Sequence, residues 1–341
     1  MQLREPEWAD WPDDKLLEMR VCDLGVTIRG TMLERRIRDL RRELRRRGLT
    51  GFRPHFWLSD EWYCPDGVPG VAIPFYLAHP RLIRLERKLM LDAEGSNRDE
   101  FMRLMRHETG HAIDNAYRIR RRRSRQKLFG YSSERYLDDY LPRPYSRRYV
   151  VHLDGWYAQS HPDEDFAETF AVWLTPGSSW RTRYAGWPAI KKLRYVDEVM
   201  REVAGRPQPV TTRTRMDAVS QLRKTLREHY DQRRAYYSLE TPVEYDRDLR
   251  RLFSNDGEFN SNPSASRFIG RIRKNVRRRV AKWTGVFQYT IDQVIAEMID
   301  RCRELELRLA VPPEEAELDF TIALTVHTLN YVNSGRPRVV R

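Results

Sequence analysis

The sequence predicts an α+β protein in which residues 1–204 form a domain with a small mixed sheet and residues 205–341 form a basic, mainly α-helical accessory region. Three observations support this division. Short apolar runs before residue 95 have the length of strands, whereas farther along the chain apolar residues recur at helical spacing. The segment 205–210 is rich in Pro and Gly and has no apolar periodicity, which is typical of a linker. We therefore place the domain boundary after residue 204.

The elements before residue 95 are expected to include both strands and helices. In chain order they are a strand at 19–28, a basic helix at 31–47, strands at 52–58 and 71–78, and a short helix at 80–91. Thr31 is a good N-cap residue, and Gly48 follows the end of the basic helix. Pro74 lacks a backbone N–H and belongs at a sheet edge or a bulge. That edge either accepts an extended peptide as a further strand or is protected from pairing by the proline, and both interpretations stay open.

The segment 106–115, Arg-His-Glu-Thr-Gly-His-Ala-Ile-Asp-Asn, carries the first candidate site. In a helix, His107 and His111 lie one turn apart on the same side, so both can bind one Zn²⁺. Glu108 is rotated by about 100° around the axis, where it can take a proton from a metal-bound water as a general base. The alternative is a surface helix that happens to carry two histidines.

The context of this segment favours the metal site. The helix is expected to begin at Ser96 or Asn97. Its apolar residues form one stripe that faces a core, namely Phe101, Met105, Ala112, Ala116 and Ile119. The two histidines flank that stripe, where ligands are held rigidly. Gly110 costs a helix about 1 kcal/mol relative to Ala, so we expect another segment to approach the backbone closely there.

A catalytic zinc needs a third protein ligand, and the segment 160–174 supplies a candidate. Pro162 suits a first helical turn. The apolar residues that follow predict a buried helix face, namely Phe166, Phe170, Trp173 and Leu174. Glu164 and Glu168 share another face, so Glu164 can bind the metal while Glu168 accepts the free ring N–H of a ligating histidine. Asp114, one turn past the second histidine, is a further candidate for that orienting role. The alternative is a pair of solvated helix carboxylates.

The segments 107–114 and 164–170 together resemble the glutamate-type zincins, or gluzincins, and their local pattern is similar to that of anthrax lethal factor. The chain is more similar still to a bacterial family of zinc-binding metallopeptidases. The close motif match covers about 107–174, and the broader resemblance runs from about 64 to 204. The sequence departs from the family pattern in the two aspartates that flank Glu164.

This resemblance implies a zincin-like catalytic domain. In the family pattern the first glutamate of the second segment binds zinc and the second one supports a ligand, which correspond here to Glu164 and Glu168. A tyrosine seven residues before the glutamate ligand stabilises the oxyanion in that pattern, and Tyr157 stands at the same offset.

The composition indicates which kinds of partner and which cellular compartment to expect. The net charge of +13 suggests acidic partners such as nucleic acid, an acidic protein segment or an anionic surface. Cys22, Cys64 and Cys302 are too few and too scattered for a disulfide framework, as is typical of a reducing compartment. The N-terminus lacks the apolar stretch of a signal peptide, and no run is long enough to cross a bilayer. We therefore expect a cytoplasmic protein with no membrane partner.

The other features are less specific. The basic run 118–127 is interpreted as the solvated tail of the histidine helix, with a phosphate-binding surface as the alternative. His152 is a candidate second oxyanion donor, although a lone histidine is more often structural. In the C-terminal region we expect polar helices at 212–237, 242–253, 264–308 with a break, and 313–333. Within the third of these, 271–282 is a second basic stretch with an apolar stripe of Ile272, Val276 and Val280.

Three functions are consistent with these residues. The leading hypothesis is a zinc metallopeptidase that hydrolyses a restricted protein or peptide substrate, for which the positive charge suggests acidic character. One alternative, less favoured, is a basic nucleic-acid-associated module with a structural or vestigial zinc site. The other is a zinc amidase that acts on a non-protein amide, because the metal-site residues by themselves do not distinguish one amide from another.

Overall fold

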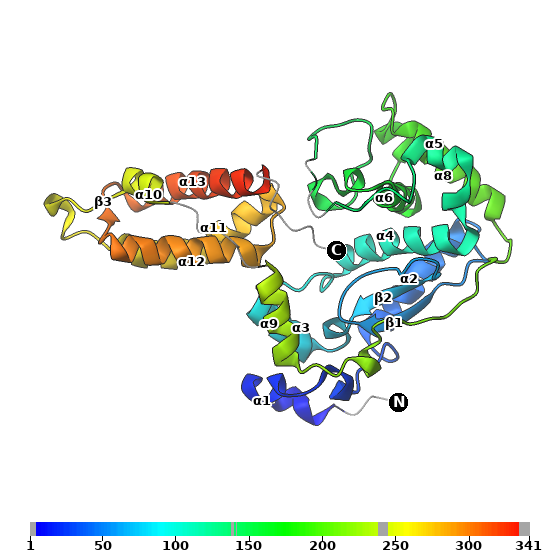
Figure 1. The fold of residues 1–341 in the computed structure, drawn as a ribbon, viewed down its shortest axis with the longest axis horizontal. Coiled ribbons are helices and arrows are strands. Elements are labelled where there is room, and N and C mark those ends of the chain that lie inside the picture. The colour runs from blue at the N-terminus through cyan, green and yellow to red at the C-terminus, as the bar shows by residue number, and fades with distance from the viewer. Residues whose placement is uncertain (1–4, 138–139, 141, 238–244, 334–341) are drawn as a thin grey trace. The chain divides into compact units, whose positions relative to one another are not determined.

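The computed structural model describes residues 5–137, 140, 142–237 and 245–333 (Figure 1). The fold is mixed but mostly helical, and the described residues form two small two-stranded sheets. The chain divides into two compact units. The described part of the first unit runs through Leu89 and over 93–229, and that of the second covers 90–92 and continues from Tyr230.

The division between the units therefore falls after His229 rather than after residue 204. The segment that follows residue 204 stays with the first unit because it is hydrogen bonded there. For example, the ring N–H of Trp57 donates to the carbonyl of Met216 at 2.8 Å. The long helix expected in this segment accordingly begins only with α9 (Leu226–Tyr237).

The N-terminal part of the chain contains three α-helices and two strands, namely α1 (Asp13–Leu17), α2 (Met32–Arg46), α3 (Pro80–Met90), β1 (His55–Ser59) and β2 (Gly70–Pro74). The predicted N-cap of α2 is confirmed, because Thr31 Oγ1 accepts the N–H of Leu33 at 3.2 Å. β1 and β2 pair in parallel, with Trp57 opposite Ala72.

Two of the predicted strands were wrong in whole or in part. The segment 19–28 contains a 3₁₀ turn, Val21–Leu24, because its backbone bonds to the later chain: the N–H of Val21 donates to the Lys224 carbonyl at 3.0 Å. The strand predicted at 71–78 ends at Pro74, and Phe75–Ala78 form another 3₁₀ turn.

The strand β2 is also covered on its second edge. The N–H of Ala72 donates to the Tyr63 carbonyl at 2.8 Å, and every residue of β2 is buried. This stretch of the edge is therefore paired already, which favours protection over the addition of a peptide strand.

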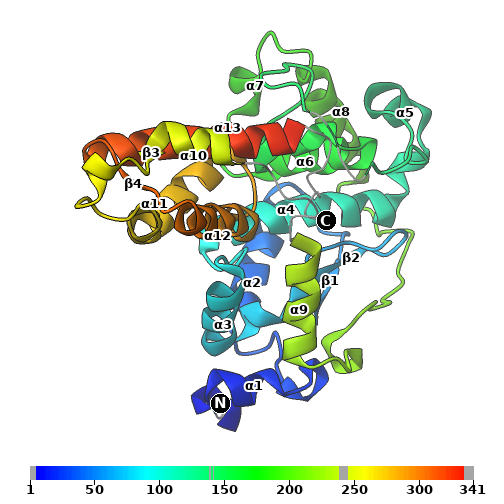
Figure 2. The ribbon, with the colours of Figure 1, turned by 60° about the vertical axis from the view of Figure 1, so that its left-hand side comes forward.

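The helices α4 (Arg98–Tyr117) and α6 (Pro162–Leu174) run side by side in the first unit (Figures 1 and 2). The predicted start of α4 is confirmed, because Asn97 Oδ1 accepts the N–H of Glu100 at 2.9 Å. The predicted apolar stripe is fully buried, although its last residue, Ile119, lies in the 3₁₀ turn that follows α4. A Cβ at Gly110 would lie 2.7 Å from Ala167 Cα, so the expected close approach at this glycine is confirmed and comes from α6.

Three further helices complete this side of the unit: α5 (Arg123–Phe129), α7 (Trp180–Arg183) and α8 (Ile190–Val203). The basic run 118–127 is more than a solvated tail. Arg118 turns the chain out of α4 with a φ of 53°, and Arg125 of α5 is fully buried. Its guanidinium donates to the Gly130 carbonyl at 2.7 Å and to the Asp163 carboxylate, so this arginine is structural.

The second unit is built from α10 (Asp246–Leu252), α11 (Ala265–Thr284), α12 (Gln288–Glu304) and α13 (Pro313–Asn333), with a short antiparallel pair of β3 (Phe253–Ser254) and β4 (Arg308–Leu309). The predicted break within 264–308 is confirmed at Gly285, which has a φ of 72° and separates α11 from α12. The predicted stripe of α11 is buried in the core of this unit. None of the described helices is long and apolar enough to cross a membrane.

The contact at Gly110 can be tested with paired glycine substitutions. We expect Gly110→Ala to destabilise the first unit by about 1–3 kcal/mol, because the new Cβ overpacks the contact with α6. Gly270→Ala in α11 is the control, since its Cβ would meet nothing within 4 Å. There the gain in helix propensity predicts a stabilisation of about 0.5–1 kcal/mol. Thermal unfolding followed by circular dichroism measures both, and a raised melting temperature for Gly110→Ala would contradict the packing described here.

Candidate metal centre

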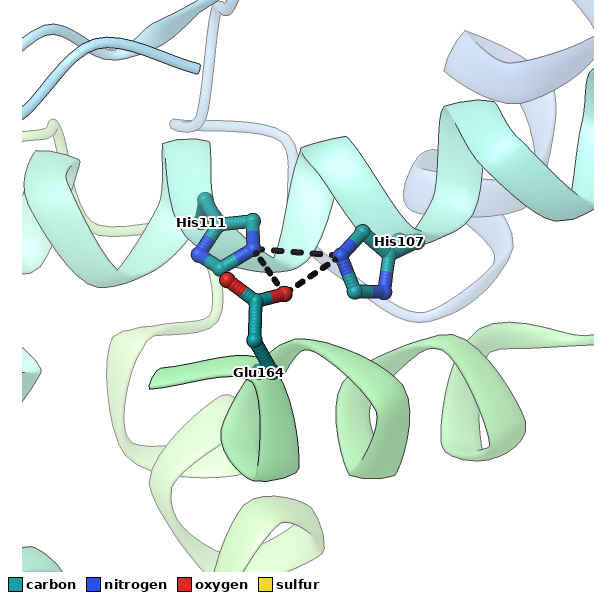
Figure 3. A group of neighbouring side chains, drawn as sticks. All are labelled: His107, His111 and Glu164. Atoms are coloured by element: carbon teal, nitrogen blue, oxygen red, sulfur yellow. Dashed lines mark hydrogen bonds and ion pairs between the residues drawn. The ribbon is translucent and has the colours of Figure 1, made fainter. Parts of the chain in front are cut away.

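Two histidines of α4 and one glutamate of α6 meet at a single point (Figure 3). Glu164 Oε2 lies 2.9 Å from His107 Nε2 and 3.1 Å from His111 Nε2. The two Nε2 atoms are 3.2 Å apart. The structure thus brings together the three residues that the sequence proposes as metal ligands.

The spacing of these atoms fits a metal ion. Two nitrogen ligands of a tetrahedral Zn²⁺, each 2.0–2.1 Å from the ion, are about 3.3 Å apart, close to the 3.2 Å observed between the two Nε2 atoms. His107 and Glu164 are buried, whereas the His111 side chain is 13 % exposed. The cluster can therefore hold a metal ion, and His111 is its most exposed member.

Glu168 determines which ring nitrogen of His107 is available to bind a metal ion. Its Oε1 lies 2.9 Å from His107 Nδ1, and its Oε2 accepts the backbone N–H of Leu153 at 2.8 Å. Burial raises the pKa of Glu168, but the hydrogen bond to His107, the charges of His107 and His152 and the Leu153 N–H together outweigh burial and leave that pKa lowered. Because an ionised carboxylate only accepts hydrogen bonds, Nδ1 carries the proton and Nε2 presents its lone pair to the ligand cluster.

The charges of the cluster favour a cation. Burial lowers the pKa of His107, but hydrogen bonds to Glu164 and Glu168 outweigh burial and leave that pKa well above its ordinary value. Burial raises the pKa of Glu164, yet the two histidines outweigh it and hold that pKa well below its usual range. The site thus attracts positive charge, either as protons or as a metal ion that replaces them.

Glu108 lies outside the ligand cluster and has the properties of a base. The side chain is buried, and burial raises the pKa of its carboxyl group, with only partial compensation from the two histidines. A carboxylate with a raised pKa binds a proton more strongly near neutral pH, which suits general-base chemistry.

The aspartates that flank Glu164 do not compete for this position. Asp163 accepts hydrogen bonds from Arg125 and from the Ser132 hydroxyl. Asp165 forms a buried ion pair with Lys192 of α8. Both carboxylates are therefore engaged away from the histidines, and Glu164 alone of the three reaches them.

Asp114 differs from the role expected of it. Its Oδ1 accepts the backbone N–H of Arg120 at 2.6 Å, and its carboxylate lies 3.7 Å from the Arg120 side chain. Asp114 thus stabilises the turn that follows α4 instead of orienting a histidine. The reason is that this residue faces the turn, where a backbone donor is available.

Two tyrosines stand beside the cluster, and only one was expected. The ring centre of Tyr157 lies 5.5 Å from that of His107, and burial together with Glu164 raises the Tyr157 pKa well above its ordinary value, so the phenol keeps its proton. Tyr136 was missed. Its hydroxyl donates to Glu164 Oε1 at 3.0 Å, and its ring stacks on His161. Tyr136 lies in an irregular loop, where no periodicity points to the site.

Two other residues near the site have structural partners. The His152 ring, through Nε2, bonds to the Arg103 carbonyl of α4 at 3.0 Å, which supports the structural interpretation of this histidine. Asn115 holds the loop that precedes β2, because its side chain donates to the carbonyls of Pro65 and Val68, each at 3.0 Å.

Comparisons with protein families, with curated proteins and with solved structures find no match to this chain. The interpretation of the site therefore depends on its own geometry and chemistry.

The ligand set predicts a simple pattern of metal contents. We expect one zinc ion per chain in the wild-type protein and a loss of bound zinc in His111→Ala, because two remaining ligands bind the ion weakly. The control is His79→Ala, which removes a histidine that pairs with Glu5 instead. Elemental analysis after dialysis against a weak chelator measures all three proteins. Retention of zinc in His111→Ala would contradict the assignment.

The role of Glu168 is tested by Glu168→Gln. The amide is neutral and has one acceptor oxygen for the two N–H groups that Glu168 accepts, so the hydrogen bond that fixes the His107 tautomer is weakened, and we expect a metal affinity about 10–100-fold lower. A competition titration with a chromophoric chelator gives this affinity. An unchanged affinity in a folded variant would show that the hydrogen bond to His107 does not support the metal.

Proposed function

We propose that the first unit is a zincin-like metallopeptidase domain, in which His107, His111 and Glu164 hold Zn²⁺ and peptide bonds are hydrolysed. The observation that carries this proposal is the convergence of the two Nε2 atoms and Glu164 Oε2 on one point, with the two nitrogens close to the spacing that a tetrahedral ion requires. The fixed tautomer of His107 supports it, because a preset nitrogen lone pair is what a ligating histidine provides.

The metal ion and Glu108 have separate roles in the hydrolysis of the peptide bond. When bound, Zn²⁺ acts as a Lewis acid that lowers the pKa of a water and polarises a carbonyl. Glu108 takes a proton from the attacking water as its oxygen bonds to the carbonyl carbon. It then delivers that proton to the nitrogen as the carbon–nitrogen bond breaks, and the products are a carboxylate and an amine.

The hydroxyls of Tyr157 and Tyr136 donate hydrogen bonds to different oxygen atoms. Tyr157 remains protonated because burial and Glu164 raise its pKa, so its hydroxyl can donate to the oxyanion that forms at the scissile carbonyl. A donor placed in this way contributes about 3 kcal/mol. Tyr136 has a different function: its bond to Glu164 Oε1 positions the carboxylate so that Oε2 faces the histidines.

The substrate is proposed to be a protein or peptide of acidic character, in keeping with the net charge of +13. The three cysteines are free thiols, which fits a reducing cytoplasm. Among the described residues the cluster offers three protein ligands, the number that catalytic zinc sites use, which supports a catalytic role for the site.

The general base is tested by Glu108→Gln. The variant is expected to keep its zinc, because Glu108 is not a ligand, and to lose activity by about 10²–10⁴-fold, because the amide cannot accept the proton. Glu198→Gln is the matched control, since Glu198 is an exposed residue of α8. Cleavage of a peptide library followed by mass spectrometry gives the rates. Equal turnover by Glu108→Gln and Glu198→Gln would refute the mechanism.

The class of substrate is tested in cells. New protein termini are compared between cells that express the wild-type protein and cells that express Glu108→Gln at equal abundance. Termini found only with the wild-type protein establish a peptidase and identify the residues at the cleavage site. If zinc is bound but no such termini arise, an amidase acting on a non-protein amide becomes the better assignment. Salt-dependent binding of nucleic acid that chelation leaves unchanged would instead favour the binding module.

A further inference from the structure

A cationic groove lies in the first unit, away from the residues of the metal centre. It consists of two adjoining cavities of about 630 Å³ and 390 Å³, which share Thr50, Arg53 and Arg213. The larger one is bounded by the loop before β1 and by the segment 205–213, and the smaller one extends over the C-terminal end of α2. The volumes are in the range of small-molecule sites.

The lining of the groove carries a strong positive charge. Four arginines surround it, namely Arg41, Arg45, Arg53 and Arg213, and no carboxylate is among the lining residues. All four are exposed, and no ion pair to a described carboxylate is formed by any of them. Several other arginines of this unit are paired with carboxylates, for example Arg106 with Glu43 at 2.7 Å. Four like charges around one cavity repel one another, and an anionic ligand would remove that repulsion.

The walls of the groove are held in place by the backbone. The Arg53 N–H donates to Gln208 Oε1 at 2.7 Å, and the Gly205 N–H donates to the Gly48 carbonyl at 3.0 Å. A Cβ at Gly51 would lie 1.9 Å from the Arg206 carbonyl oxygen, so only glycine permits this approach. The arginines therefore project from a fixed frame, which lowers the entropy lost on binding a ligand.

We propose that this groove binds a ligand that presents two or more phosphate groups. The guanidinium fork matches phosphate oxygens in pairs, and Thr50 lines both cavities with a hydroxyl group. A terminal phosphate carries about −1.5 to −2 charges in a small volume, which suits a compact cavity better than the single charges spaced along an acidic peptide. The aromatic rings in the lining, Phe52 and His55, are both buried, so phosphate and not a nucleobase is recognised.

The test uses inorganic tripolyphosphate as the probe and isothermal titration calorimetry on the full chain. Saturable binding is expected, with an affinity at least tenfold lower in the double variant Arg53→Ser and Arg213→Ser. The control removes two exposed arginines from α11, Arg271→Ser and Arg278→Ser, and is expected to bind like the wild-type protein. Because all three proteins keep the metal ligands, chelation of the metal by the probe affects them equally. Circular dichroism verifies that the variants fold.

Three further probes, ATP, a single-stranded oligonucleotide and polyglutamate, test which kind of anion the groove binds. Binding of ATP and of a short single-stranded oligonucleotide, each compared with binding of tripolyphosphate, distinguishes a free polyphosphate from a nucleic-acid strand. Weaker binding of either probe by the groove variant supports the phosphate site. Equal losses in the groove and control variants, or no saturable binding of any phosphate probe, would overturn it. So would polyglutamate binding as tightly as tripolyphosphate, because an acidic peptide would then be the better ligand.

Discussion

The close contact between α4 and α6 is the constraint on which the rest of the first unit depends. Gly110 lets the α4 backbone reach Ala167 of α6 with no Cβ between them. Glu164 lies about one turn before that contact, and Glu168 directly follows Ala167. The same contact therefore aligns one glutamate with the cluster of histidine Nε2 atoms and the other with His107 Nδ1. The helix propensity lost at Gly110 is thus the cost of a geometry that a larger residue would disrupt.

Charge pairing determines which carboxylate of α6 faces the histidines. The acidic residues at the start of α6 have separate partners: Asp163 binds Arg125, Asp165 binds Lys192, and Glu164 alone faces the histidines. A buried carboxylate without a partner is costly, so each pairing also fixes the rotation of α6 about its own axis. The arginine groove shows the opposite situation, because its cations are exposed and have no described carboxylate partner. This contrast is what distinguishes a structural charge from one that is available to a ligand.

Local spacing predicted which residues converge at the candidate metal centre and little of their surroundings. The sequence placed His107 and His111 on one helix, selected Glu164 as their partner and indicated a close approach at Gly110, because helical periodicity relates residues a few positions apart. Tyr136 was missed because irregular loops have no periodicity, and Asp114 was misassigned because the backbone donor that it binds becomes apparent only in three dimensions. The strand expected at 19–28 and the boundary expected after residue 204 failed for a related reason: long-range backbone bonds to 205–229 determine both. The groove joins segments more than 150 residues apart, which no local pattern relates.

The proposed centre holds a bound ion with two imidazoles and one carboxylate and leaves one position open. Zinc K-edge X-ray absorption spectroscopy on the zinc-loaded protein tests this arrangement most directly. We expect four nitrogen or oxygen neighbours at about 2.0–2.2 Å with the outer scattering of two imidazole rings and no sulfur. A sulfur neighbour at about 2.3 Å, or a shell without imidazole scattering, would place the ion elsewhere in the chain and contradict the assignment of this centre.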